Sequence, residues 1–269
     1  MLDNGFVDIH AHIIPGVDDG PKTIDESLKI IEAALRGGTS ILACTSHIRE
    51  GLYDNSIETL RKKFEELVKK TAEIGLEIKL AFGAEIHVRR DLCKMLNDNL
   101  LPTYSDTGKY ILLEFPMGTI PDWADEIIFE LKINDIIPII AHPERSVGKL
   151  KNLQRVYDLV YKGAMIQLNS TSIVGGFGKN ILEIAMKMVQ LNLVHFVASD
   201  AHLSNSRSPD LSNAFNIVCR EFDKNTAEKL FKRNPRAVIE GSQVVVQTPQ
   251  RYSEKSLSIF EKIKMKVLN

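Results

Sequence analysis

Residues 6–20 read FVDIHAHIIPGVDDG, and they contain the strongest indication of the fold. Phe6 to His10 has the short, largely apolar pattern of a buried strand. His10 and His12 lie where this strand ends, and residues two apart on a strand point to the same face. The stretch therefore predicts a first strand that brings two imidazoles together at its carboxyl end.

The following sequence alternates between helical and strand patterns. Thr23 to Glu26 forms a capping box, apolar residues follow at helical spacing, and Gly37-Gly38 ends this predicted helix. The other predicted strands are residues 40–44, 78–84, 110–115, 136–141, 165–169 and 195–199, and the other predicted helices are 57–74, 120–134, 150–161 and 180–191. Such alternation predicts a single α/β domain with a parallel sheet of seven strands and helices outside it.

The composition excludes several classes of protein. The 269 residues are 44% hydrophobic and 26% charged, the balance of a folded globular domain and not of a disordered or collagen-like chain. With 34 basic and 35 acidic residues the net charge is -1, so no overall positive field attracts nucleic acid. Three cysteines without paired spacing, no apolar stretch of membrane-spanning length and no signal peptide predict a cytoplasmic protein.

Polar residues recur where the predicted strands end. Positions 10, 47, 85, 114, 142, 169 and 200 are separated by 37, 38, 29, 28, 27 and 31 residues, each the size of one strand-plus-helix unit. Residues that follow successive strands of a βα barrel converge on one face. Nine candidate metal ligands should therefore meet in one cup: His10, His12, Asp19, His47, Glu85, Glu114, His142, Asp200 and His202.

This mixture of imidazoles and carboxylates indicates the kind of metal. Without cysteine it suits Mn, Fe, Zn or Co, with Mg as a further alternative, and not a thiolate-rich structural zinc site. Nine ligands are too many for one ion, whereas with Glu85 bridging two ions they suit three divalent cations. Arg145 and Arg207 follow ligands closely in sequence and would add positive charge for a phosphate dianion. The alternative for each arginine is a surface salt bridge.

The motifs that carry these residues resemble those of a known superfamily. They are the run from Asp8 to Gly20, Thr45-Ser-His47, Gly83-Ala-Glu85-Ile, Ala141-His-Pro-Glu-Arg145 and Ser199-Asp-Ala-His202. Together they are similar to the polymerase and histidinol phosphatase (PHP) superfamily, and within it to the metal-dependent protein-tyrosine phosphatases of bacterial capsule and exopolysaccharide operons. The resemblance covers about residues 5–240. It implies a distorted, TIM-like (βα)7 barrel with its metal site at the carboxyl ends of the strands.

The resemblance also implies an activity and a role for each ligand. It implies a trinuclear centre, usually of manganese, and as substrate the tyrosine-phosphorylated tail of a bacterial tyrosine kinase that controls polysaccharide export. One ion would be held by His10, His12, Glu85 and Asp200, a second by Glu85, Glu114 and His142, and a third by Asp19, His47 and His202, with Arg145 and Arg207 clamping the phosphate. A hydroxide bridging two ions would attack phosphorus in line.

Contacts with the rest of the substrate are less well indicated. Tyr53 and Phe177 lie in loops after strands, where they could flank the substrate ring or be ordinary surface or core residues. After His47 the sequence Ile48-Arg49-Glu50 departs from the more basic or histidine-rich loop that the resemblance leads us to expect.

Several other functions share some of these features. A cysteine-based tyrosine phosphatase needs arginine six residues after its cysteine, and none of the cysteines at 44, 93 and 219 has one. An amidohydrolase shares the His-x-His motif but usually has a lysine at the positions that Glu85 and Glu114 occupy here. A PHP phosphatase of a small phosphomonoester such as histidinol phosphate, a PHP nuclease, and a non-catalytic, metal-stabilised kinase adaptor remain as alternatives.

The last residues differ from the rest of the chain. We expect residues 1–250 to form the catalytic barrel and residues 251–269 a basic, amphipathic extension, with five basic and two acidic residues and apolar residues at helical spacing. This segment would be a terminal helix that packs on the barrel, or else a helix that docks on a membrane surface or a partner. The sequence does not indicate the oligomeric state.

Overall fold

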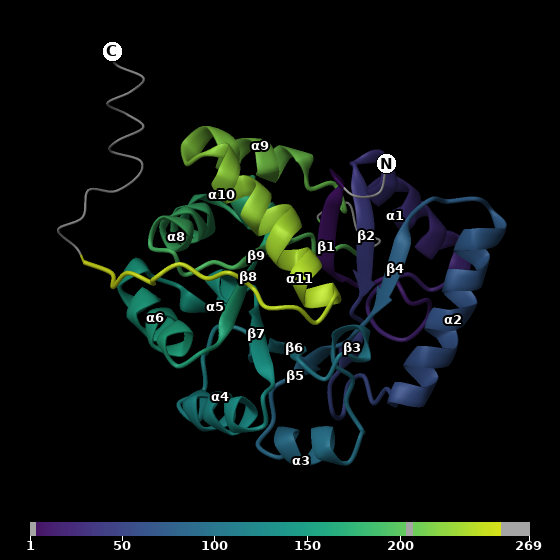
Figure 1. Cartoon of the computed structure of the whole chain (residues 1–269), viewed down its shortest axis with the longest axis horizontal. Helices are drawn as coiled ribbons and strands as arrows, with labels where there is room; N and C mark the ends of the chain where they lie inside the picture. The colour runs from purple at the N-terminus through teal and green to yellow at the C-terminus, as the bar shows by residue number, and fades with distance from the viewer. Residues whose placement is uncertain (1–3, 203–206, 254–269) are drawn as a thin grey trace.

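The computed structural model describes residues 4–202 and 207–253. The strands are β1 (Phe6–Ala11), β2 (Thr39–Cys44), β3 (His47–Ile48), β4 (Lys79–Phe82), β5 (Glu85–His87), β6 (Tyr110–Glu114), β7 (Ile137–Ala141), β8 (Met165–Asn169) and β9 (Phe196–Ala198). The α-helices are α1 (Ile24–Arg36), α2 (Ile57–Glu73), α3 (Leu92–Asn97), α4 (Ala124–Ile133), α5 (Glu144–Val147), α6 (Leu153–Tyr161), α7 (Ser170–Ile173), α8 (Lys179–Gln190), α9 (Ser212–Glu221), α10 (Lys224–Glu228) and α11 (Asn234–Ile239). The strands lie at the centre and the helices surround them (Figure 1).

The strands form two parallel sheets that are linked at both edges. The sheet orders are β1-β2-β4 and β3-β5-β6-β7-β8-β9. At one edge the amide of His12 donates to the carbonyl of Ala201 (2.9 Å) and that of Asp200 to His10 (2.8 Å), which joins β1 to the segment after β9. At the other edge β2 and β4 run on into β3 and β5. The α/β prediction with parallel strands is therefore confirmed.

The short strands β3 and β5 differ from the sequence prediction. The chain leaves the first sheet after Cys44 and after Phe82 and, within a few residues, pairs again as part of the second sheet. The amides of Gly83 and Glu85 donate to the carbonyls of Cys44 and Thr45, both at 3.1 Å, and hold the two crossing segments together. Strands of two or three residues are too short to show a period, so the sequence pattern could not reveal them.

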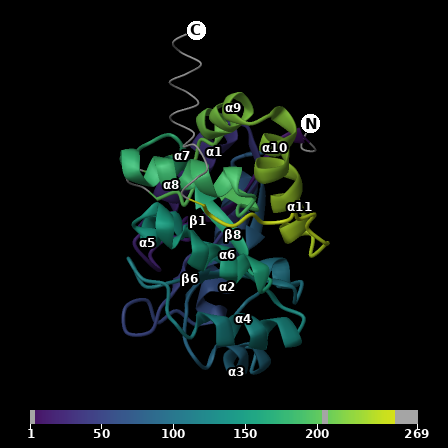
Figure 2. The ribbon, with the colours of Figure 1, turned by 90° about the vertical axis from the view of Figure 1, so that its left-hand side faces the viewer.

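The core has an inner and an outer layer because alternate residues of each strand face opposite ways. The inner cluster joins residues of both sheets, among them Ile9 and Ile41 from the first and Leu112 and Phe196 from the second. The outer cluster packs the other strand faces against the surrounding helices. Figure 2 shows helices α4, α6 and α8 stacked along one side of the strands. Both faces of the strands are therefore buried.

Helix α1 has the predicted boundaries. The Thr23 hydroxyl accepts a hydrogen bond from the Glu26 amide (3.3 Å), and the Glu26 carboxylate accepts one from the Thr23 amide (3.3 Å). The helix ends at Arg36, and Gly38 has a φ of 88°, a conformation that favours glycine. The capping box and the glycine stop are confirmed.

The expected C-terminal helix lies outside the described residues, because only residues 251–253 of that segment are described. Arg251 lies over the ring of Tyr157 at 5.0 Å, and Tyr252 packs against the outer core. The division into a domain of residues 1–250 and an extension stays a prediction. Among the helices of the described ranges, none combines the length and apolar character needed to cross a bilayer.

Candidate metal centre

The structure brings all nine predicted ligands to the carboxyl ends of the strands. Five of them lie at or just after β1, β6, β7 and β9, and His202 follows a few residues later. His47 and Glu85 come just after β2 and β4, as the first residues of β3 and β5, and Asp19 is in the loop after β1. Their ligand atoms form four overlapping groups within 4.8 Å: His12, Asp19, His47 and His202; His10, His12 and Glu85; His10, His142 and Asp200; and His47, Glu85 and Glu114. This clustering is what the spacing of polar residues along the sequence predicts.

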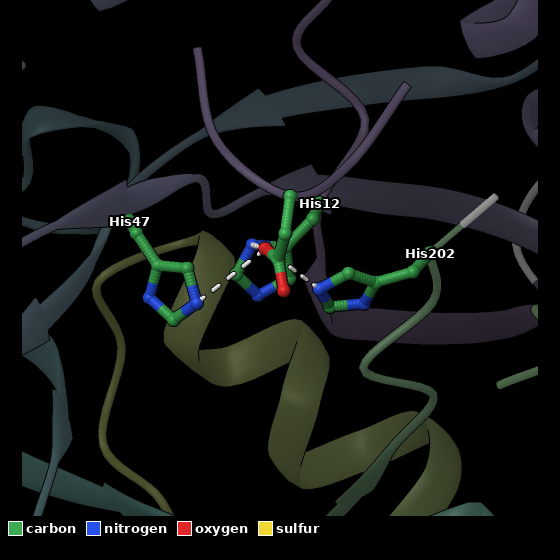
Figure 3. Close-up of side chains that lie close together, drawn as sticks. His12, His47 and His202 are labelled. Carbon is green, nitrogen blue, oxygen red and sulfur yellow. Dashed lines mark hydrogen bonds and ion pairs between the residues drawn. The ribbon is translucent and has the colours of Figure 1, made fainter. Parts of the chain in front are cut away.

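Three imidazoles and one carboxylate form the outermost group. The rings of His12, His47 and His202 lie next to one another, with centroids 4.5 Å apart for His12–His47 and 4.1 Å for His12–His202 (Figure 3). Asp19 Oδ1 lies 3.1 Å from His202 Nε2 and 3.7 Å from His47 Nε2. These four side chains come from three segments, far apart in sequence, that only the fold brings together.

Glu85 lies at the centre of the cluster. Its Oε2 is 3.4 Å from His10 Nε2, 3.2 Å from His12 Nε2 and 3.1 Å from His47 Nδ1, while its Oε1 is 3.0 Å from His142 Nε2. Only 1% of its side chain is exposed. A buried carboxylate whose two oxygens face different sets of imidazoles is placed to bridge two ions.

The grouping differs in three details from the one that the resemblance implies. His12 belongs to two groups, one of them with Asp19, and His47 also joins Glu85 and Glu114. His142 belongs with His10 and Asp200, although its Nε2 also contacts Glu85. These differences concern which neighbours share an ion and not which residues line the cup.

Buried polar atoms without partners show that the residues fit metal ions. Within the ligand groups of the described residues, His47 Nδ1, Glu114 Oε2 and Asp200 Oδ1 are buried and make no hydrogen bond. Each such atom costs about 1–3 kcal/mol in a fold. Divalent cations would give the atoms in the ligand groups the partners that they lack, so the donor set is suited to metal.

The pKa shifts indicate a site that attracts cations. Burial would raise the pKa of Glu85 and Asp200, but the histidines around them hold both pKa values below their ordinary range. Burial would lower the pKa of His12, but its contacts with Asp18 and Glu85 raise it well above its ordinary value. A proton on an imidazole here takes the place of a cation, and metal binding would displace it.

Two of the ligands have a strained backbone. His142 and Asp200, which follow β7 and β9, have φ values of 32° and 52°. Residues other than glycine seldom adopt this left-handed region, and such strain concentrates at functional sites. This backbone conformation directs both side chains into the cup directly after their strands.

Three residues outside the predicted ligand set orient the ligands. Asp18 Oδ2 is 2.9 Å from His12 Nδ1, and Gln167 Oε1 is 2.9 Å from His10 Nδ1. Asn169 donates to Asp200 Oδ2 (2.9 Å). All three fix the direction of a ligand, and the acceptors Asp18 and Gln167 also raise the basicity of the histidines that they face. Two signals could have found them: Asp18 is adjacent to Asp19, and Gln167 and Asn169 alternate on one strand face that ends at the cup.

Asp18 also shapes the loop after β1. Burial would raise its pKa, but the hydrogen bond with His12 lowers it to about 2. Its Oδ1 accepts from the Gly20 amide at 2.9 Å. A Cβ on Gly20 would come within 2.7 Å of the His12 carbonyl oxygen, so only glycine allows the loop to close this tightly.

Both predicted arginines reach the cup, where they contact a buried ligand, so neither forms merely a surface salt bridge. Arg145 Nη1 donates to Asp200 Oδ2 at 3.3 Å, and Arg207 Nη1 donates to the same oxygen at 2.9 Å. Their side chains are 20% and 21% exposed. The guanidinium groups therefore lie between the ligands and solvent, where a phosphate group could contact both.

Two aromatic residues lie at the rim of the cup. The ring of Tyr53 stacks on that of His47, with centroids 5.3 Å apart and an interplanar angle of 3°. The ring of Phe177 lies 5.1 Å from Arg145 Cζ. Each loop residue thus contacts one side chain of the site.

The cysteines are placed for packing. Burial raises the pKa of the Cys44 thiol far above its ordinary value and that of Cys93 to about 11. Burial is also the main cause of the raised pKa of Cys219. Because the thiolate is the nucleophile in cysteine-based phosphatases, these thiols are unsuited to that chemistry.

Comparison with known proteins agrees with the resemblance seen in the motifs. The profile of the family described as capsular polysaccharide synthesis, CpsB/CapC, matches residues 6–240. Tyrosine-protein phosphatase YwqE of Bacillus subtilis is 33% identical over 252 residues, covering 94% of this chain and 98% of YwqE. Tyrosine-protein phosphatase CpsB of Streptococcus agalactiae serotype V is 35% identical over 247 residues, covering 89% and 100%.

A solved structure is also similar. It comes from work on YwqE from Bacillus subtilis and CpsB from Streptococcus pneumoniae, described there as unique metal-dependent tyrosine phosphatases. It matches with a TM-score of 0.88 and 32% identity, covering 92% of this chain and 100% of the other. This chain therefore belongs to the CpsB/CapC family of capsular polysaccharide synthesis proteins.

Proposed function

We propose that this chain is a metal-dependent protein-tyrosine phosphatase that removes phosphate from a bacterial tyrosine kinase controlling capsule or exopolysaccharide synthesis. The observation that carries the proposal is the buried cup of nine histidine and carboxylate ligands with two arginines joined to Asp200. The names of the relatives, YwqE and CpsB, support the same activity. The substrate would be the phosphorylated tyrosine tail of the kinase.

The cofactor would be three divalent ions, with Mn²⁺ as first choice and Fe, Zn, Co or Mg as alternatives. The donors are imidazole and carboxylate groups, which suit these metals. The ligands would be His10, His12, Asp19, His47, Glu85, Glu114, His142, Asp200 and His202, with Glu85 shared. When bound, such ions polarise phosphoryl oxygens and lower the pKa of water towards neutrality.

The charge of the cup favours a phosphate dianion. Its four carboxylates contribute roughly -4 and three divalent ions would contribute roughly +6, and Arg145 and Arg207 raise the sum from about +2 to about +4. Each guanidinium has five N–H donors, and Asp200 accepts one hydrogen bond from each arginine. Other donors remain to hold the equatorial phosphoryl oxygens as charge spreads over them.

The leaving phenolate needs little protonation, and its aromatic ring needs only a flanking contact. Phenol has a pKa of about 10, so phenolate departs with little help from a proton donor. Tyr53, stacked on His47 at the rim, would flank the substrate ring. The residues of this chain thus bind and orient the ester, and the cations assist its hydrolysis.

Phosphate release from three substrates tests the proposal. With Mn²⁺ the enzyme should hydrolyse a phosphotyrosine peptide faster than histidinol phosphate or a dinucleotide. Chelation should abolish turnover and added Mn²⁺ should restore it, whereas alkylation of the three cysteines should leave most of it. Preference for histidinol phosphate would favour the small-molecule alternative, no turnover of any substrate would favour the adaptor, and full activity after exhaustive chelation would contradict a metal mechanism.

A further inference from the structure

A groove opens beside the metal centre. It has a volume of about 830 Å³ and is lined by residues 118–120, which follow β6, and by residues of α5, of the 3-10 turn Leu150–Asn152 and of α6. Helices α5 and α6 lie side by side in both views (Figures 1 and 2). Arg145 lines this groove and also donates to Asp200 in the cup. The groove and the metal centre therefore share a wall.

The charges along the groove are mostly positive. Its lining includes Arg145, Lys149, Lys151 and Arg155 against Asp158. Arg155 is engaged in the wall itself, since its guanidinium donates to Asp125 Oδ1 (2.7 Å) and to the Pro121 carbonyl (3.1 Å).

Lys149 and Lys151 are different. Both are exposed, and neither ammonium group makes a hydrogen bond or ion pair with any residue in the described ranges. Two unpaired cations thus lie in a groove that begins at the phosphate-clamping arginine.

We propose that this groove docks acidic residues of the substrate next to the phosphotyrosine, with Lys149 and Lys151 as the residues that select them. The inference rests on the proposed function, because it assigns the groove to the peptide that carries the phosphate. Carboxylate side chains complement the two free ammonium groups. An extended peptide advances about 3.3 Å per residue, so residues a short way from the phosphotyrosine pass over the groove.

The groove also separates protein substrates from small phosphomonoesters. A small ester that occupies the cup does not reach past Arg145 into the groove, whereas the residues of a peptide on either side of the phosphotyrosine do. The two lysines lie in the groove and not in the cup, so their contribution falls mainly on KM. Because they are exposed and screened by salt, this contribution weakens as ionic strength rises. Selectivity for acidic sequence around the phosphotyrosine is then a property of this surface and not of the metal site.

A charge-reversal pair tests this inference in the Mn²⁺-loaded enzyme. K149E/K151E is compared with K29E/K79E, which makes the same change of charge at two exposed lysines of α1 and β4. These elements lie on the opposite side of the strands from α5 and α6 (Figure 1). The substrates are a phosphotyrosine peptide with flanking Asp and Glu, the same peptide with Lys at those positions, and p-nitrophenyl phosphate.

The readout is kcat/KM for each peptide relative to p-nitrophenyl phosphate. For the acidic peptide this ratio should fall about tenfold in K149E/K151E, mainly through KM, and should not change in the control. The lysine peptide should become the better substrate of K149E/K151E, and K149A/K151A should show a fall of about threefold for the acidic peptide.

The failures are distinguishable. If the wild type hydrolyses both peptides equally well, or if both double variants lose the same amount, the groove does not dock acidic residues, and the phosphatase activity stands. If the wild type hydrolyses no phosphotyrosine substrate in Mn²⁺, the proposed function fails and this inference fails with it.

Discussion

The two ends of β9 hold buried titratable side chains in opposite states. Before the strand, His195 is 4% exposed, its Nδ1 accepts a hydrogen bond from the Ile166 amide (3.0 Å), and burial lowers its pKa to about 4. After the strand, Asp200 is fully buried and ionised, and its Oδ1 makes no hydrogen bond with any described residue. Burial is common to both. Asp200 Oδ2 accepts from Asn169, Arg145 and Arg207, so the difference lies in Oδ1 alone: a buried atom left without a hydrogen-bond partner distinguishes the ligand from the structural group.

The largest effect is expected from the removal of Glu85, another buried carboxylate of the ligand groups. Glu85→Ala should lose bound metal, and its rate should fall by well over the roughly 10- to 100-fold typical when a residue that merely orients a ligand is changed. Metal content measured by mass spectrometry, together with kcat, checks this. The control is His87→Ala, because His87 is 21% exposed and belongs to none of the ligand groups, although its Nδ1 lies 3.5 Å from Glu114. Equal losses at both positions would show that the ligand is misplaced.

The arginines should affect rate without affecting metal. Arg145→Ala and Arg207→Ala each remove charge-assisted hydrogen bonds worth about 1.5–3 kcal/mol apiece, so kcat should fall about 10- to 100-fold. Lysine should rescue poorly, since a point charge cannot copy the planar fork. Steady-state kinetics on a phosphotyrosine peptide, with metal analysis, measure both effects. Wild-type kinetics in the alanine variants would mean that the arginines only pair with Asp200.

Much of the fold and the clustering of the site could be predicted because both follow from local pattern. Strands and helices alternate with clear periods, and the polar residues His47, Glu114 and Asp200 recur in phase with strand ends, so parallel strands must bring them together. The pairing of β3 with β5 could not be predicted, since it depends on bends between strands. The same holds for Gln167, whose contact with His10 joins strands far apart in sequence, and for Lys149, whose groove is also lined by residues 118–120.

A smaller effect should come from the residues that orient the ligands. Asp18→Asn keeps an acceptor but removes the charge facing His12 Nδ1, so Mn²⁺ affinity should fall roughly tenfold. Titration of the metal-free enzyme with Mn²⁺ measures this. Asp54→Asn is the matched control, since Asp54 is exposed in a neighbouring loop and, among the described residues, accepts only from the Gly51 amide (2.8 Å). A loss equal to that of the control would show that Asp18 serves the loop and not the metal.

The smallest effect on activity should come from His195, whose role is confined to stability. Its pKa lies near 4 in the fold and near 6.5 in the unfolded chain, so between these values the unfolded chain binds a proton that the fold rejects. The stability that neutral His195 provides is complete above pH 6.5 and is lost as the pH falls towards 4. Between pH 7 and pH 5 the loss should be about 2 kcal/mol.

Asparagine substitutions near the two ends of β9 isolate the contribution of His195 to the pH dependence of stability. In His195→Asn the side-chain oxygen can still accept from the Ile166 amide but cannot titrate, so urea unfolding of the metal-free protein should lose about 2 kcal/mol less than the wild type between pH 7 and pH 5. Its activity and metal content at pH 7 should match the wild type. His202→Asn, at the other end, should lose metal and activity instead, because His202 lies 3.1 Å from Asp19 within a ligand group. If His195→Asn lost metal, or if its acid sensitivity equalled that of the wild type, then partners would not be what separates the two ends of the strand.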